Sequence, residues 1–137
     1  MKVYFDTNII IDILLKRELF FHTSFEVLMK VARGYAEGII GANAIVDIFY
    51  IVNKNVRNNK ETMDSIFDVL DIVSLADTTA QDIFEARYLD MPDYEDAVIA
   101  SIAFRENASY IVTRNIADFA NSPVPAVLPD DFLKILG

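Results

Sequence analysis

The residues best suited to chemistry are carboxylates that follow apolar segments. Asp6 ends the β-branched and aromatic run Val3-Tyr4-Phe5, and the apolar run Ile9-Ile10-Ile11 follows closely. This pattern predicts a strand that gives way at once to a helix, which places Asp6 at the carboxyl edge of a sheet. Ligands bind at that edge in open α/β sheets. Asp6 is therefore the first candidate for a functional carboxylate.

A second group of acids, Asp93, Glu95 and Asp96, lies where a helix is predicted to begin. Asp93 is a good N-cap, and an acid three residues later resembles a capping box, so a structural role can explain Asp93 or Glu95. Asp96 is harder to explain in this way, because the apolar residues after it mark a heavily buried helix and a lone buried charge is costly. We therefore expect Asp96 to point into the molecule or into a cleft.

A third polar cluster follows the β-branched run 110–113. Thr113 can donate a hydrogen bond to a neighbouring carboxylate or to a phosphate oxygen, and Arg114 offers a planar fork suited to phosphate. Asn115 and Asp118 complete the cluster, but both are also good turn residues. A functional site and a simple turn explain these four residues equally well.

The fourth candidate, Asp47, lies on the predicted helix after the second strand. Its neighbours Ile45, Val46, Ile48 and Phe49 are all apolar. An acid in such a setting either faces solvent on a thin polar stripe or serves a site.

Apolar periodicity divides the chain into alternating strands and helices. Runs rich in β-branched and aromatic residues predict strands at 2–5, 36–41, 72–75, 110–113 and 126–128. Helical spacing predicts helices at about 8–15, 23–33, 43–54, 60–70, 79–89, 93–107 and 130–136. This alternation predicts an α/β protein with a mostly parallel sheet and helices on both faces, in a single domain spanning residues 1–137.

Composition limits the chemistry. With 21 acidic and 12 basic residues the net charge is −9, so the chain has no general attraction for nucleic acid. The absence of cysteine excludes disulfides and thiolate sites, and the single His22 excludes a His-rich metal site. No apolar run reaches the length of a membrane span and no signal peptide is evident, so we expect a cytoplasmic protein without membrane association.

The candidates are more informative together than singly. A parallel fold would bring Asp6, Asp96 and the turn with Asn115 and Asp118 to one edge, where their charges repel one another. A hard cation resolves that repulsion, and oxygen ligands without His or Cys favour Mg²⁺ or Mn²⁺ over Zn²⁺. Such a site activates water and neutralises a phosphodiester during hydrolysis.

Five segments, taken in order, resemble the PIN-domain family, and the likeness is greatest to the VapC-like toxins of bacterial toxin–antitoxin pairs. They are residues 5–9 (FDTNI), 93–97 (DYEDA), 111–119 (IVTRNIADF), 124–125 (VP) and 129–133 (PDDFL). The resemblance implies a three-layer α/β/α sandwich and a Mg²⁺- or Mn²⁺-dependent endoribonuclease that hydrolyses RNA. It also implies a homodimer and a cognate antitoxin protein whose tail covers the active site.

The resemblance assigns roles residue by residue. Asp6 matches the first metal-binding acid, Asp96 the acid at the start of the long helix, and Thr113 the hydroxyl of the site. Asp47 stands where the family usually has Glu, and Asn115 stands where the family often has an acid. Because Asn brings no charge, Asp118 or Asp93 is expected to complete the metal ligands.

Two other functions are compatible with parts of this pattern. A degenerate PIN fold would bind RNA or a partner without cleavage, and the departures at Asp47 and Asn115 keep that alternative open. A phospho-receiver domain also gathers acids at the edge of a parallel sheet. It needs an adjacent acid pair and a late lysine, however, where this chain has Asp6-Thr7 and Thr113-Arg114.

Overall fold

The chain forms a five-stranded sheet in which every neighbouring pair of strands is parallel. The structure is a computed structural model that describes residues 1–137. The strands lie in the order β3-β2-β1-β4-β5. Their bounds are β1 Lys2–Phe5, β2 Glu37–Gly41, β3 Ser74–Ala76, β4 Tyr110–Val112 and β5 Ala126–Val127. The first strand is thus central, and Tyr4 pairs with Ile39 of β2 and with Ile111 of β4.

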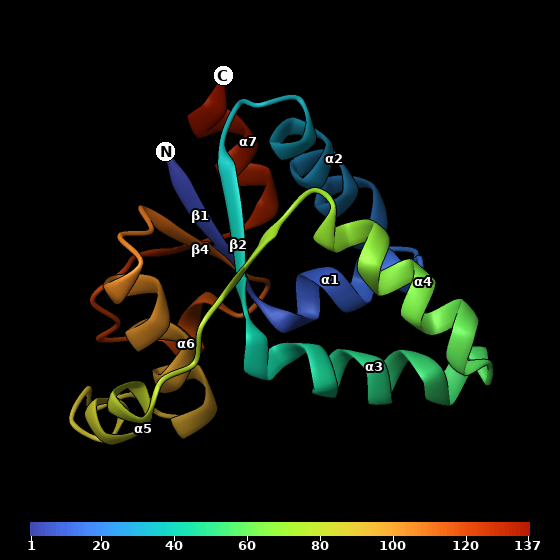
Figure 1. Cartoon of the computed structure of the whole chain (residues 1–137). Coiled ribbons are helices and arrows are strands. Elements are labelled where there is room, and N and C mark those ends of the chain that lie inside the picture. Colours follow the sequence, from blue (N-terminus) through green and yellow to red (C-terminus); the bar gives the residue numbers. More distant parts are fainter.

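Helices cover both faces of this sheet (Figure 1). Their bounds are α1 Thr7–Leu14, α2 Phe21–Ala32, α3 Ala42–Val56, α4 Asn59–Leu70, α5 Ala80–Ala86, α6 Tyr94–Arg105 and α7 Pro129–Leu136, with a 3-10 helix, η1, at Ile116–Phe119. Helices α1, α2, α3, α4 and α7 pack on one face, and α5, α6 and η1 pack on the other. None of the helices has both the length and the hydrophobicity needed to cross a lipid bilayer.

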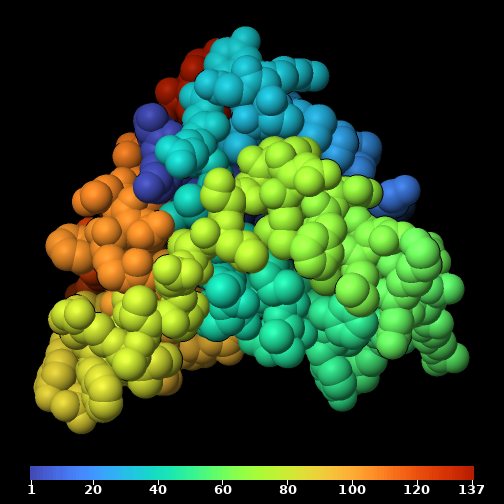
Figure 2. All heavy atoms as spheres, in the orientation of Figure 1, coloured from blue at the N-terminus to red at the C-terminus, as the bar shows by residue number.

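Alternate side chains of the strands belong to two separate hydrophobic cores, one on each face of the sheet. Val3 and Phe5 of β1 belong to the core under α1 and α2, whereas Tyr4 belongs to the core under α6. Because both faces are buried, the strands read as continuous apolar runs. Helices α3 and α4 pack against each other. In Figure 2 they form a teal and green lobe beside the yellow lobe of α5.

The predicted α/β/α sandwich is confirmed, with an entirely parallel sheet. The third strand begins two residues later than expected, at Ser74. The reason is that the N–H groups of Ile72 and Val73 both donate to the carbonyl of Val69 and so belong to the turn that ends α4. The strand order also differs from the 2-1-3-4-5 order of phospho-receiver domains, which excludes that alternative on the fold.

Candidate active site

Asp6 lies where the central strand ends and α1 begins. Its backbone is extended, with φ −65° and ψ 151°, and its side chain accepts a hydrogen bond from the N–H of Thr7 at 2.8 Å. Asn8 donates from Nδ2 to the other carboxylate oxygen at 3.2 Å. The residue is only 5% exposed. The end of β1 and the first turn of α1 thus hold this carboxylate at the carboxyl edge of the sheet.

The neighbouring strand supplies a hydroxyl that fixes the same carboxylate. Thr113 follows β4, is fully buried, and donates from Oγ1 to Asp6 Oδ2 at 2.7 Å. Its oxygen accepts in turn from the N–H of Asn115 at 3.0 Å. The sheet sets this contact, because the N–H of Asp6 also donates to the carbonyl of Val112 at 3.0 Å. The orientation of Asp6 is therefore set by its helix, its strand and Thr113.

An open cavity of about 330 Å³ lies against Asp6. Three separate segments contribute acids to its walls, namely Asp6, Asp93, Glu95, Asp96 and Asp118. The other lining residues are Thr7, Asn8, Ile11, Arg17, Ile51 and Asn115. The structure therefore brings five of the predicted site residues into one cavity, with Thr113 directly beneath it.

Helix α6 presents two of these acids from its first turn. Asp93 is the N-cap, and its side chain accepts from the N–H of Glu95 at 2.8 Å, so the predicted capping role is present. The residues from Ala97 to Ala103 are all buried, which holds the helix rigidly against the sheet. The free N–H groups of the helix start favour negative charge nearby. Asp96 is thus fixed at the cavity by a well-packed helix.

The turn after β4 forms η1 rather than an irregular loop. The N–H of Asp118 donates to the carbonyl of Asn115 at 3.1 Å, and buried Phe119 anchors the turn in the core. Asn115 and Asp118 are both exposed and both line the cavity. The turn and the site explanations of this cluster are therefore compatible.

The acids perturb one another's protonation. Burial raises the pKa of Asp6, although the hydrogen bond from Thr113 opposes that rise. Burial and then the charges of the neighbouring acids, Asp6 foremost, raise the pKa of Asp96 to about 7. Burial also raises the pKa of Glu95, with smaller contributions from nearby acids. An uncompensated excess of negative charge is thus a physical property of this cavity.

Asp47 is the predicted site residue that does not line the cavity. It is exposed on α3, four positions before Ile51, which does line the cavity. Residues four apart lie on the same side of a helix, so Asp47 lies beyond the rim on the cavity side. Its charge contributes, after burial, to the raised pKa of Glu95. Asp47 acts on the site from a distance.

Asn8, Glu95 and Arg17 are polar lining residues that were not predicted to belong to the site. Asn8 follows Asp6 in the first turn of α1, and that spacing was a usable signal. Glu95 was explained as part of a helix start, and its exposed position in the first turn leaves it free to face the cavity. Arg17 could not be foreseen, because it reaches the cavity only through the packing of the α1–α2 connection.

Arg114 has a different role from the one its position suggested. Its Nε donates to Oδ2 of Asp12 at 2.5 Å and its Nη2 donates to Oδ1 at 3.3 Å. Asp12 is fully buried on α1 and also pairs with Nη1 of Arg17 at 3.2 Å. The expectation of a guanidinium fork free to bind phosphate is therefore wrong for Arg114, because a buried carboxylate already engages its fork.

The donors around Asp6 suit a hard divalent cation. The acids and the two asparagines offer side-chain oxygen atoms, and the side-chain carbonyl oxygen of Asn8 is buried without a hydrogen-bond partner. A buried polar atom normally has a partner, which an ion or an ordered water would provide. No three acidic side chains converge closely enough to hold an ion between them. An ion here would keep part of its water shell, as Mg²⁺ usually does. The residues present fit a hydrated cation.

Comparisons with solved structures agree with the fold. One match is the crystal structure of VapBC2 from Rickettsia felis bound to a DNA fragment from its promoter. It has a TM-score of 0.73 and 22% identity, and it covers 93% of this chain and 98% of that chain. FitAB bound to the IR36 DNA fragment matches with a TM-score of 0.66 and 17% identity over 93% and 94% of the two chains. At these identities the likeness is one of fold.

By sequence, the chain matches a family model but no curated protein. A search of curated proteins found no match. A family model described as PIN domain matches residues 2–117, a range that contains the strands β1 to β4 and every residue that lines the cavity except Asp118. The parallel sheet and the position of Asp6 at its carboxyl edge agree with this match. The match over residues 2–117 shows that the chain belongs to the PIN domain family.

Proposed function

We propose that this protein is a divalent-metal-dependent endoribonuclease and the toxin of a toxin–antitoxin pair. The observation that carries the proposal is the cavity that five carboxylates line at the carboxyl edge of a PIN-domain sheet. Proteins with PIN domains are generally nucleases. Three of these acids, Asp6, Glu95 and Asp96, have raised pKa values. The arginine at the cavity, Arg17, is already paired with Asp12. Such a cluster has no evident structural purpose and is typical of catalytic sites.

Asp6 and Asp96 are the proposed principal metal ligands, with Asp93 and Asp118 acting directly or through water. Asp47 is proposed to act only through water, in keeping with its place beyond the rim. Mg²⁺ or Mn²⁺ bound here would activate the attacking water and neutralise the charge that develops on the phosphodiester. Hydrolysis then forms one bond from water oxygen to phosphorus and breaks one ester bond.

The chain's own residues hold this site in place. The hydrogen bond from Thr113 and the cap of α1 orient the carboxylate of Asp6. Ligands fixed in this way lose little freedom when the substrate binds. The amide of Asn115, beside the site hydroxyl, offers a neutral contact for a phosphate oxygen or for a water.

The direct test is cleavage of a labelled RNA panel by the purified chain in Mn²⁺ and in chelator. We expect cleavage only with the metal, and a loss of about 100-fold or more in kcat for Asp6→Asn and for Asp96→Asn, because each removes a charge from the catalytic site. The matched control is Asp71→Asn, which removes an exposed acid at the end of α4. The absence of metal-dependent cleavage would refute the nuclease, and cleavage that survives both site substitutions would refute the assignment of its active site to Asp6 and Asp96.

A cognate antitoxin and a homodimer are further parts of the proposal. The similar structures are VapBC2 and FitAB complexes with DNA, which supports a protein partner for this chain. Light scattering of the isolated chain should give twice its mass of 15.5 kDa. A single-chain mass at micromolar concentration would contradict the homodimer without bearing on the nuclease.

A second candidate is a PIN fold that binds RNA without cutting it. The observation that favours it is that no three acidic side chains converge on one point. The same RNA panel separates the two functions, since a non-cleaving protein would retain RNA in Mn²⁺ and leave it intact.

A further inference from the structure

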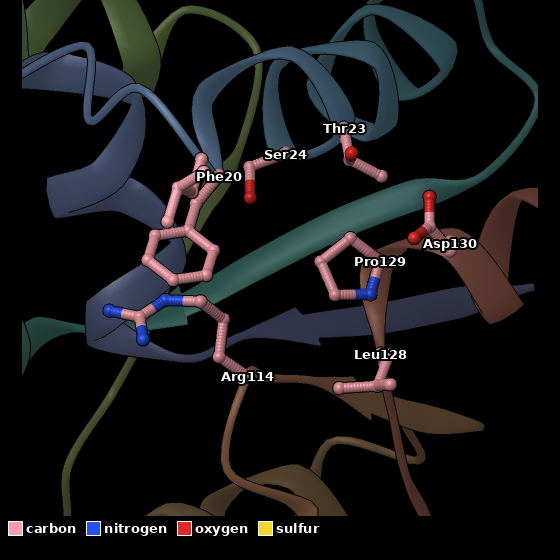
Figure 3. A pocket seen from close by; sticks show the side chains of 8 residues that line it. Phe20, Thr23, Ser24, Arg114, Leu128, Pro129 and Asp130 are labelled. Atoms are coloured by element: carbon pink, nitrogen blue, oxygen red, sulfur yellow. The ribbon is translucent and has the colours of Figure 1, made fainter.

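A second hollow, of about 460 Å³, is lined on one side by Arg114 (Figure 3), the residue before Asn115, which lines the acidic cavity. Its walls come from the connection before α2, the first turns of α2, the residue after Thr113, and the start of α7. They are Leu19, Phe20, Thr23, Ser24, Arg114, Leu128, Pro129 and Asp130. The mixture of apolar and polar side chains distinguishes it from a simple packing defect.

Arg114 connects this hollow to the proposed active site. It lies in the chain between Thr113, which binds Asp6, and Asn115, which lines the acidic cavity. Its guanidinium lies over the ring of Phe20, 4.1 Å from the ring centroid. Because Asp12 holds the guanidinium through two hydrogen bonds, the stacked pair is rigid and forms one wall of the hollow.

Two polar groups of the hollow bear on what it could bind. The hydroxyl of Ser24 is fully buried and has no hydrogen-bond partner, and Figure 3 shows it turned toward the space beside Pro129. A buried polar atom without a partner is costly and needs an explanation. Asp130 adds an exposed carboxylate on the opposite side, which can accept hydrogen bonds but repels anions.

We propose that this hollow, the base subsite, binds a nucleobase of the RNA substrate next to the phosphate that is cleaved. The inference rests on the proposed nuclease function and names the part of the substrate that this hollow holds. Single-stranded RNA is recognised by bases that stack on aromatic rings and arginine planes and bond through their edges. Phe20 and Arg114 provide the stacking surface, and Ser24 and Asp130 provide the edge contacts.

The charges of the hollow favour a base over a phosphate. The fork of Arg114 is already engaged by Asp12, so little remains to bind a phosphate in a bidentate manner. The carboxylate of Asp130 opposes a phosphate and accepts from the amino or imino groups of a base. The apolar side chains of Leu128 and Pro129 cover a ring without competing for its edge.

The test uses NMR spectra of the whole chain in chelator, titrated with the four nucleoside 5′-monophosphates and, separately, with inorganic phosphate. We expect the nucleotides to shift the methyl signals of Leu19 and Leu128 and the amide signal of Ser24, and inorganic phosphate to leave them unchanged. Thr23→Trp fills the base subsite from the surface of α2 and should abolish these shifts. His22→Trp places the same indole side chain at an exposed neighbouring position outside the subsite and should preserve them.

In the cleavage assay, Thr23→Trp should raise KM for RNA about tenfold, with kcat unchanged, since losing one stacked base costs on the order of 1 to 3 kcal/mol. The absence of nucleotide shifts, equal shifts with inorganic phosphate alone, or shifts that persist in Thr23→Trp would overturn the inference. Loss of antitoxin binding in Thr23→Trp without any nucleotide shift would assign the hollow to the antitoxin instead. Because binding is measured without metal or turnover, failure of the nuclease proposal would leave this readout intact.

Discussion

At the residue scale, one carboxylate organises the site. Asp6 is nearly buried, yet three hydrogen bonds hold it, from Thr7, Asn8 and Thr113. The sequence could predict its position, because a strand that ends on Asp before a helix leaves few alternatives. It could not predict the pairing of Asp12 with Arg114, which are 102 positions apart and meet only through tertiary packing.

The raised pKa of Asp96 predicts a pH-dependent stability in chelator. The native carboxyl titrates at about 7, whereas its ordinary value is 3.8. Between these values the native state binds more protons than the unfolded state, so stability falls as pH rises from 4 to 7. Asp96→Asn removes this loss of folding stability. The variant should therefore be more stable than wild type above pH 7 and no more stable below pH 4. Urea unfolding across this range measures the difference.

The control for this pH dependence is Asp68→Asn, which removes an exposed acid on α4 away from the cavity. It changes the net charge by the same amount and should show no comparable gain at high pH. An equal gain from both substitutions would mean that general charge repulsion, and not the local site, is responsible.

At the element scale, the junction between β2 and α3 is tightly packed against the core. Gly41 ends β2 and is the residue before α3, and its N–H donates to the hydroxyl of Tyr4 at 2.9 Å. The sequence predicted the strand and helix on either side of Gly41 from their apolar periods. It could not show that a side chain at this position would meet Tyr4 and Ile102, because those contacts depend on how β1 and α6 pack beside β2.

Gly41→Ala should destabilise the protein by about 1–3 kcal/mol, the usual cost of overpacking. The added Cβ would lie 2.5 Å from Oδ1 of Asn43, 2.7 Å from the hydroxyl of Tyr4 and 3.2 Å from Cδ1 of Ile102. Chemical denaturation measures this loss. Ala42→Ser, at the exposed next residue, should change stability by less than about 0.5 kcal/mol. Equal stability of Gly41→Ala and wild type would show that the junction tolerates a side chain.

At the scale of the whole molecule, the proposed RNA substrate and the protein carry charge of the same sign, so the proposed function depends on a cation bound in the cavity. The net charge of −9 repels RNA, and the acids that face the cavity would repel it most. Alternating strands and helices predicted the sheet and its parallel sense. The sequence alone could not show that the turn after β4 joins two hollows, because that arrangement depends on how α2 and α7 pack together.

The central claim is that the carboxylates around Asp6 form a divalent cation site. Calorimetric titration of the metal-free protein with Mn²⁺ tests it most directly. We expect saturable binding by the wild type and by Asp68→Asn, and binding weakened about tenfold or more in Asp6→Asn and in Asp96→Asn, because each loses a charged ligand. Equal Mn²⁺ binding by all four proteins, or no binding by the wild type, would contradict the claim.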